Sequence, residues 1–291
     1  MSTRGGGGLR SRLSRWFLRP YAWRYEQLRA EMIRTRQSLR YLALAQLLNR
    51  VGQHSDDLTL YELSVFSQNG EDGVLAEILR RTGTGSKYFV EIGASANEAN
   101  CIFLADVLGW RGLFVDADEG EYEALRTKYL GIAGVQVIRA RVARDNVNSL
   151  LRESAVPHDI DVLSIDIDGN DYWIWEALVD YSPRVVVIEF NASIDPRRQL
   201  VQPYSPDQGW DESDFFGASL GALCKLGGKK GYSLAHVDLS GVNSFFVRNE
   251  FAAQFPSDHI RGRAFNMYLS GRRHPKHDAP ATPYVDLESG S

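Results

Sequence analysis

The sequence predicts an α/β fold, with a seven-stranded, mostly parallel sheet that closes in an antiparallel hairpin. Length is the first reason, since 291 residues suffice for one α/β domain and an extension. The second reason is that short apolar, β-branched runs alternate with helical stretches after Leu58, as in parallel sheets covered on both faces. Third, only residues 239–243 separate the last two runs, which favours a hairpin there.

The chain is expected to divide into a basic helical arm over residues 1–57, the α/β domain over 58–271 and a disordered tail over 272–291. The tail is rich in Pro, His, Ser and Gly. The expected strands are Tyr88–Ile92, Gly112–Val115, Val135–Val142, Asp161–Ile167, Arg184–Phe190, Tyr232–Asp238 and Ser244–Val247. The expected helices between them are Asn100–Leu108, Glu119–Tyr129, Val147–Glu153 and Tyr172–Asp180.

The arm and the rest of the chain carry opposite charge. Residues 1–50 hold eleven arginines and two glutamates, a net charge of +9, whereas the remainder holds 22 basic and 35 acidic residues, a net charge of −13. The arm therefore predicts an anionic partner, which could be the acidic body itself. The acidic main domain argues against a nucleic-acid partner.

Two helices are expected within residues 9–51 of the arm. Leu9, Leu13 and Trp16 recur at helical spacing between arginines, the pattern of a helix that lies on an anionic membrane surface. The alternative is a helix that packs on the acidic body or on another subunit of a homo-oligomer. The second helix, over residues 24–51, suits a short coiled coil or a docking surface. Its apolar stripe consists of Leu28, Met32, Leu39 and Leu42.

Cysteine usage and hydropathy predict a cytoplasmic protein, peripheral at the inner face of the membrane if the arm binds lipid. Cys101 and Cys224 are the only cysteines, and their distance along the chain is typical of reduced thiols. No apolar run approaches the length that spans a bilayer, and arginines interrupt the apolar core that a secretion signal needs.

A turn of small residues follows the first expected strand. The strand ends at Glu91 and Ile92, and residues 93–96 let the backbone approach a ligand at the carboxyl edge of the sheet. Gly93 and Ser95 are therefore expected to bind a cofactor, and Glu91 to accept hydrogen bonds from its cationic or hydroxyl groups. The alternative is a tight strand–helix turn without a ligand.

An acid at the end of the second strand strengthens the cofactor interpretation. Asp116 follows the glycine turn by about 20 residues, where a carboxylate can accept both hydroxyls of a ribose. Asp118 competes for this role, two residues further on. No G-x-G-x-x-G sequence accompanies the turn, which disfavours a dinucleotide and favours S-adenosylmethionine (SAM).

Three aspartates follow the fourth strand. Asp166 and Asp168 share a strand face by period two, and the bend at Gly169 could bring Asp171 beside them. Clustered carboxylates repel one another unless a cation or a proton intervenes, and Mg²⁺ prefers oxygen ligands. The segment therefore predicts a Mg²⁺ site at Asp166 and Asp168. In the alternative, Asp168 or Asp171 only caps the following helix.

The fifth strand brings Glu189 and Asn191 to the same edge of the sheet. A carboxylate and an amide oxygen there are further candidate ligands for the metal or the substrate. The alternative is a pair of edge residues without chemistry.

Four segments resemble the FkbM-type methyltransferases, across residues 60–250. They are Ser67–Gly73, Phe89–Ala94, Asp166–Tyr172 and Ile188–Asn191. The resemblance implies a Rossmann-like class I methyltransferase fold that methylates a hydroxyl, often of a sugar or glycoconjugate, with SAM; some enzymes of the related macrocin O-methyltransferase type need Mg²⁺. It implies SAM contacts for Gln68, Glu71, Glu91, Gly93 and Asp116, and places Asp166, Asp168, Glu189 and Asn191 nearer the acceptor. Asn97 departs from the family pattern, because a glycine usually stands there.

Methyl transfer to a hydroxyl requires a base that takes its proton. A carboxylate of the aspartate segment, Asp166 or Asp168, can do so, and His236 on the sixth strand is a further candidate. A lone histidine on a strand is more often structural. His158 lies at the start of the strand that bears the aspartates, which is the wrong end of the sheet.

Residues 204–216 are expected to form a long loop over the site. Their acids and aromatics suit a carbohydrate acceptor, and Trp210 could stack on a sugar ring. Trp173 and Trp175 fit helix packing better than such stacking.

Two alternatives to the methyltransferase remain open at the level of sequence. In one, the α/β domain is a catalytic relic and the chain is a scaffold that binds a membrane or a partner through its basic arm. In the other, Asp166 and Asp168 serve a Mg²⁺-dependent phosphotransferase with an aspartate nucleophile. That reaction lacks the expected downstream lysine and Ser/Thr, and it leaves the glycine turn unexplained.

Overall fold

The computed structural model describes residues 28–29, 31–47, 55–207, 210–211, 213–256 and 284–288. The chain divides into two units, Met1–Val51 and Gly52–Ser291. In the first unit, residues 28–29 and 31–47 are helical, as predicted for the second helix of the arm. The predicted stripe on that helix is exposed, by 53% at Leu28, 72% at Met32, 60% at Leu39 and 67% at Leu42. The other helix predicted for the arm lies outside the described residues.

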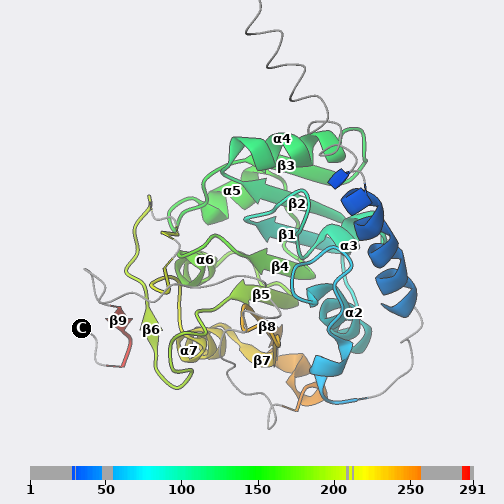
Figure 1. Ribbon diagram of the computed structural model, residues 1–291. Coiled ribbons are helices and arrows are strands. Elements are labelled where there is room, and N and C mark those ends of the chain that lie inside the picture. The colour runs from blue at the N-terminus through cyan, green and yellow to red at the C-terminus, as the bar shows by residue number, and fades with distance from the viewer. Residues whose placement is uncertain are drawn as a thin grey trace, which may run out of the picture. The chain divides into compact units, whose positions relative to one another are not determined.

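A seven-stranded sheet forms the centre of the second unit (Figure 1). Its strands are β1 (Tyr88–Ile92), β2 (Arg111–Asp116), β3 (Val135–Arg139), β4 (Val162–Ile165), β5 (Val185–Glu189), β7 (Tyr232–Val237) and β8 (Asn243–Arg248). They lie in the order β3-β2-β1-β4-β5-β8-β7. The pairs from β3 to β5 are parallel, whereas β8 is antiparallel to both β5 and β7.

This order with an antiparallel final hairpin is the Rossmann-like class I methyltransferase fold. The chain runs outward from β1 to β3 and then returns to β4 on the other side of β1. In open α/β sheets, ligands bind beyond the carboxyl ends of the strands at such a switch point. The topology therefore assigns the ligand crevice to the loops that follow β1 and β4.

Helices cover both faces of the sheet (Figure 1). They are α2 (Glu71–Thr82), α3 (Ile102–Asp106), α4 (Glu119–Lys128), α5 (Val147–Glu153), α6 (Asp171–Ala177) and α7 (Leu220–Lys230), with the 3-10 turns η1 (Leu58–Tyr61) and η2 (Asn249–Gln254). The predicted strands and the four predicted helices are present, with ends that differ by up to three residues. The sequence did not reveal α2 or α7, because glycines within both lower their helix propensity.

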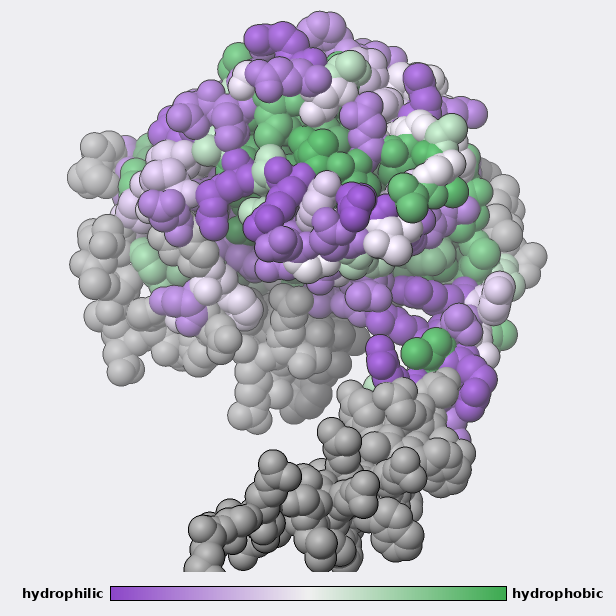
Figure 2. Space-filling model, turned by 90° about the horizontal axis from the view of Figure 1, so that it is seen from above, coloured by the Kyte–Doolittle hydropathy of each residue, from purple (hydrophilic) through white to green (hydrophobic). Residues whose placement is uncertain are grey.

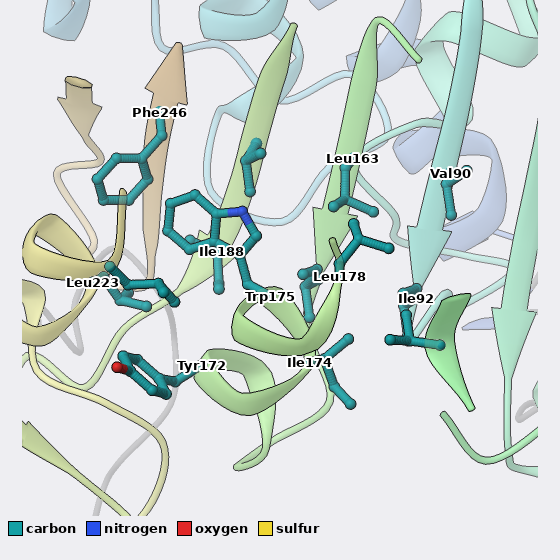
Figure 3. Packing of buried hydrophobic residues seen from close by; sticks show 14 of the residues in the cluster. Val90, Ile92, Leu163, Tyr172, Ile174, Trp175, Leu178, Ile188, Leu223 and Phe246 are labelled. Carbon is teal, nitrogen blue, oxygen red and sulfur yellow. The ribbon is translucent and has the colours of Figure 1, made fainter. Parts of the chain in front are cut away.

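Trp175 of α6 lies at the centre of the core on one face (Figure 3). Its side chain is fully buried, and its ring lies 5.0 Å from that of Phe246 on β8 and 5.7 Å from that of Tyr232 on β7. Leu223 of α7 packs in the same cluster. The alternative of helix packing for Trp175 is therefore confirmed. On the opposite side of β1 and β2, Phe89 packs against Phe114 with ring centroids 4.9 Å apart.

The C-terminal residues 284–288 are ordered against the body, so the prediction of disorder from residue 272 onward is wrong for them. Here β9 (Val285–Asp286) pairs antiparallel with β6 (Leu200–Val201). Backbone pairing and the aromatic ring of Tyr284 hold this segment, which contains none of the Pro, His, Ser and Gly that predicted disorder for the tail as a whole.

The surface of the molecule carries both hydrophilic and hydrophobic side chains. On the face seen from above, hydrophilic side chains predominate, and hydrophobic ones gather between them (Figure 2). Among the described residues, no helix is both long and apolar enough to cross a membrane.

Candidate active site

A cavity of about 700 Å³ opens at the carboxyl ends of β1 to β4, where the topology places the ligand crevice. Predicted cofactor residues from three parts of the chain meet in its lining: Gln68, Glu71, Glu91, Gly93, Ser95 and Asp116. Asp166 and Asp168 line it too. Its volume falls in the range of sites that enclose a nucleoside-sized ligand.

Gly93 lets the turn after β1 approach the end of β4. Its φ is +86°, and a Cβ at this position would lie 1.6 Å from the carbonyl oxygen of Asp166. Only glycine fits there, so the turn itself brings the residues predicted to bind the cofactor and the aspartate segment together.

Asn97, the departure from the family pattern, does not disturb this turn. It is not among the residues with positive φ, so its backbone does not require glycine. Its side chain is exposed, and its N–H donates to Ser95 Oγ over 3.3 Å.

Glu91 lines the cavity and fixes the start of α3. Its two carboxylate oxygens accept the N–H groups of Asn100 at 2.7 Å and Cys101 at 2.9 Å. The side chain is only 3% exposed, and this burial raises its pKa to about 7, against the lowering effect of the two N–H donors. A group with this pKa changes its charge near neutral pH.

Asp116 and Asp118 both line the cavity, and they differ in their hydrogen bonds. Asp118 Oδ1 accepts the N–H groups of Gly120 and Glu121, at 2.7 and 3.0 Å, so it is the N-cap of α4. Asp116 receives one backbone N–H, from Asp118, at Oδ1. Burial raises the pKa of Asp116, whose side chain is not used as a helix cap.

Glu71 and Asp72 fix the segment in front of α2. Glu71 is fully buried, and its oxygens accept Asn243 Nδ2 and the N–H of Asn69, both at 2.7 Å. Asp72 Oδ2 accepts three backbone N–H groups, of residues 65–67, and the hydroxyl of Ser67. Burial raises the pKa of Asp72 to about 6. These acids hold Gln68 at the cavity wall.

The aspartate segment turns sharply after β4 and brings three carboxylates together. Oxygens of Asp166, Asp168 and Glu189 all lie within 4.8 Å of one another. Asp168 has a left-handed φ of 55°, which Asp and Asn tolerate better than most residues. Three carboxylates at this separation repel one another, and they form an all-oxygen ligand set that fits Mg²⁺.

Asp171 does not join this cluster. It is 1% exposed, and its oxygens accept the N–H groups of Ile167 and Gly169, both at 2.9 Å. Asp171 therefore closes the turn that presents Asp168. Burial raises its pKa to about 6.

Three predicted residues do not line the cavity. One of them is Glu189, although its carboxylate lies within 4.8 Å of those of Asp166 and Asp168. Asn191 is fully buried, and its Oδ1 accepts both the N–H of Ser193 at 2.9 Å and its hydroxyl at 2.5 Å. These two bonds use the acceptor capacity that a metal would need, so Asn191 is a structural residue in this geometry. His236 is 3% exposed, and its Nε2 lies 2.9 Å from Glu62 Oε1. Neither residue lines the cavity, and the position of His236 gives no support to its role as base.

The loop over the site contributes Pro206 and Trp210 to the cavity. Trp210 Nε1 donates to the carbonyl of Ser213 at 2.7 Å, which fixes the ring. Trp173 instead donates to the carbonyl of Gln202 and packs under the guanidinium of Arg144, 4.7 Å from its ring centroid. His158 bonds the carbonyl of Asp180, near the start of β4.

Sequence reasoning missed several residues of the lining, among them Asn100, Arg141, Asn170 and Asn243. Asn243 could not be found from spacing, since it is the antiparallel pairing with Glu189 that brings it to this edge. Asn170 was within reach, because it belongs to the aspartate segment; its Nδ2 donates to the carbonyl of Ser205.

The ionisable lining is strongly acidic. The carboxylates among the described lining residues are Glu71, Glu91, Glu98, Asp116, Asp118, Glu121, Asp166 and Asp168, and the one basic residue is Arg141. Such a cavity attracts cations. A sulfonium, an ammonium or a divalent metal complements it, and a phosphate-rich dinucleotide does not.

Comparisons with known proteins give distant structural likeness only. No family model and no curated protein matches the chain. Among solved structures, the N-terminal domain of EvdMO1 with SAH bound is 14% identical, with a TM-score of 0.41, over 63% of this chain and 81% of that one. A SAM-dependent methyltransferase from Aquifex aeolicus is 13% identical, with a TM-score of 0.38, over 66% and 92%. At these values the likeness carries no argument, and the fold assignment rests on the strand order.

Proposed function

We propose that the chain is a SAM-dependent O-methyltransferase that acts on a hydroxyl of a sugar or glycoconjugate, with assistance from Mg²⁺. The observation that carries the proposal is that one cavity is lined by the Gly93 turn, by the acid after β2 and by Asp166 and Asp168, whose carboxylates lie within 4.8 Å of that of Glu189 on β5. The first two suit a nucleoside with a cationic tail, and the third suits a metal-bound diol.

On the cofactor side, Asp116 would accept the ribose hydroxyls of SAM. Gln68, Glu71 and Glu91 line the inner wall, where negative charge stabilises the sulfonium and the ammonium of the methionine part. Gly93 and Ser95 would contact the ligand through the turn. The many hydrogen bonds of Glu71 and Glu91 hold this wall rigid, which favours one bound geometry.

On the acceptor side, Asp166, Asp168 and Glu189 would hold Mg²⁺, which, when bound, lowers the pKa of a coordinated hydroxyl. Pro206 and Trp210 offer an apolar surface for the face of a sugar ring. Asp171 fixes the turn that carries Asp168, because it accepts the N–H groups of Ile167 and Gly169.

The chemical step is an in-line displacement, in which positioning and proton removal are the tasks of the protein. The hydroxyl oxygen forms a bond to the methyl carbon as the carbon–sulfur bond breaks, and the sulfur leaves as the neutral thioether. The hydroxyl proton passes to a carboxylate, and Asp166 or Asp168 is the candidate base in the cavity.

The exposed stripe on the helix of residues 28–47 favours a second role. A basic helix with an exposed apolar stripe suits an anionic membrane surface or a partner subunit. Deleting residues 1–57 separates the two roles: a methyltransferase keeps its turnover on a soluble acceptor, whereas a scaffold loses its localisation and has no turnover to keep.

Calorimetric titration of SAM into the full-length protein, with and without Mg²⁺, tests the proposal. Micromolar binding is expected, with loss in Asp116→Ala and no change in Glu123→Gln, an exposed acid on α4 that pairs with Arg126. Absence of heat and of a thermal shift with the wild type would refute the methyltransferase. Binding that survives in Asp116→Ala would refute the assignment of the ribose acid.

A further inference from the structure

The C-terminal residues 284–288 return to the body beside the loop that covers the cavity. Leu200 pairs with Asp286 and Val201 with Val285, and the N–H of Leu287 donates to the carbonyl of Gln199 at 2.9 Å. Two side chains add to this docking: Lys225 Nζ donates to the carbonyl of Leu287 at 3.0 Å, and Gln199 Nε2 donates to Glu288 Oε1 at 2.8 Å. We call residues 284–288 the C-terminal segment.

The segment docks on the stem of a hairpin. One arm of the stem begins with β6 and the other is residues 215–219. The N–H of Gln202 donates to the carbonyl of Gly217, and that of Ser219 to the carbonyl of Leu200, both at 2.8 Å. Pro206 and Trp210 lie beyond this stem and line the cavity. The position of Trp210 thus depends on how firmly the stem is held.

Tyr284 joins the segment to the second arm directly. Its hydroxyl donates to the carbonyl of Asp214 and accepts from Asn191 Nδ2, both over 3.2 Å. Its ring packs on that of Phe215, with centroids 4.5 Å apart. Burial raises the pKa of Tyr284 to about 12, so the hydroxyl keeps its proton at neutral pH and can donate and accept at once.

Asn191 connects the same point to the carboxylate cluster. Its Nδ2 also donates to the carbonyls of Asp214 and Phe216, at 2.8 and 2.9 Å. Two residues earlier in the chain, Glu189 ends β5 and belongs to the cluster with Asp166 and Asp168. A short covalent and hydrogen-bonded path therefore runs from the cluster through Asn191 to Tyr284 and the arm that follows Trp210.

We propose that Tyr284 is a positioning residue, through which the C-terminal segment sets the place of Trp210 on the acceptor side of the cavity. That Trp210 contacts an acceptor molecule rests on the proposed function. The mechanical link between Tyr284 and Trp210 does not, because it follows from the contacts alone. The closing experiment can therefore judge the link even if the protein proves not to bind SAM.

The test uses the full-length Tyr284→Phe variant, which keeps the ring and removes the hydroxyl. Trp210 is the reporter: acrylamide quenching is measured in each protein with and without Trp210→Phe, and the difference isolates its fluorescence. Loss of the two bonds is expected to raise the open population of the hairpin, and the quenching of Trp210, about five-fold. Tyr122→Phe on α4 is the matched control and should leave Trp210 unchanged.

A second variant guards against loss of folding. Lys225→Met removes the bond to Leu287 but leaves Tyr284 in place, and it should increase the quenching of Trp210 by less than Tyr284→Phe does. The SAM affinity of both variants should equal that of the wild type, because neither residue lines the cavity. A lower melting temperature with unchanged quenching of Trp210 would overturn the proposal and leave Tyr284 a purely stabilising role. Equal quenching in Tyr284→Phe and Tyr122→Phe would overturn it too.

Discussion

The two sides of the cavity use carboxylates in opposite ways. On the proposed cofactor side, Glu71, Asp72 and Glu91 accept backbone N–H groups and thereby order the loops around α2 and α3. On the proposed acceptor side, Asp166, Asp168 and Glu189 approach one another within 4.8 Å. Acids of the first kind are held by backbone donors, whereas those of the second kind lie close enough to one another to repel and to share a cation. Burial does not separate the two kinds, since Glu189 is buried like Glu91, so the comparison teaches that the arrangement of neighbouring groups decides.

Gly93 is where the two sides touch, so its replacement should have the largest effect. In Gly93→Ala the new Cβ would lie 1.6 Å from the carbonyl oxygen of Asp166, and φ is +86°. We expect a loss of at least about 3 kcal/mol in the free energy of unfolding, and no SAM binding. Urea unfolding measures the first, and calorimetry the second.

Gly228→Ala is the control for this prediction. Gly228 is exposed within α7, and a Cβ there would meet nothing within 4 Å, so alanine should stabilise the helix by about 0.5–1 kcal/mol. Equal effects of the two substitutions would show that the approach of β1 to β4 is not tight.

Asp168→Asn should impair Mg²⁺ binding and methyl transfer on the proposed acceptor side, and it should leave SAM binding on the proposed cofactor side unchanged. Asparagine tolerates the left-handed backbone at this position, so the turn should persist. We expect the thermal shift with Mg²⁺ to vanish and methyl transfer to fall at least about 100-fold, with unchanged SAM affinity. Without metal, the variant should melt at a higher temperature than the wild type, because one repelling charge is gone.

The exposed Asp145→Asn is the matched control and should change neither quantity. If chelation with EDTA left both the activity and the melting curve of the wild type unchanged, the carboxylate cluster would have a role without metal.

Glu91 predicts a pH dependence of the cofactor side. Its pKa rises from 4.5 to about 7 on folding, so between these values the folded state holds a proton that the unfolded state has lost. Its contribution to stability is therefore full below pH 4.5 and is lost as the pH rises through 7, by at most about 1.4 kcal/mol per pH unit. SAM is a cation and favours the ionised form, so its affinity should increase over the same rise in pH.

Unfolding and SAM titration between about pH 5 and pH 8 measure both trends. Glu91→Gln should flatten them, whereas Glu98→Gln, at an exposed acid of the same lining, should keep them. A SAM affinity that fell with rising pH would contradict the charge assigned to this wall.

The sequence predicted the fold well because strand–helix alternation is a local signal. All seven strands of the main sheet were placed, and the strand ends brought Glu91, Asp116 and Asp166 to one edge, as topology requires. What could not be predicted depends on which side chains are buried and on contacts far apart in sequence. Asn191 and His236 have site-like chemistry, but both are buried and hydrogen-bonded, to Ser193 and Glu62.

Contacts between residues far apart in sequence also explain why the order of the C-terminal segment was not predicted. Composition alone suggested disorder from residue 272, and no local pattern shows that Tyr284 packs on Phe215, 69 positions earlier in the chain. The sequence thus brought together the residues of the proposed cofactor side, which come from strand ends, but it could not show the hairpin and the distant segment beside the proposed acceptor side.

Asn97→Gly should have the smallest effect on SAM affinity and stability. It compares two positions of the same turn, residue 97 and Gly93. The family pattern has glycine at this position, yet Asn97 is exposed, does not line the cavity and has no positive φ. Glycine should therefore change the dissociation constant of SAM by less than about two-fold and lower stability by at most about 1 kcal/mol through greater freedom of the unfolded chain. Calorimetry and urea unfolding measure the two quantities. A ten-fold gain in SAM affinity would instead mean that the ligand needs close backbone approach at residue 97 as well as at Gly93, so that the cofactor side would extend further along the turn.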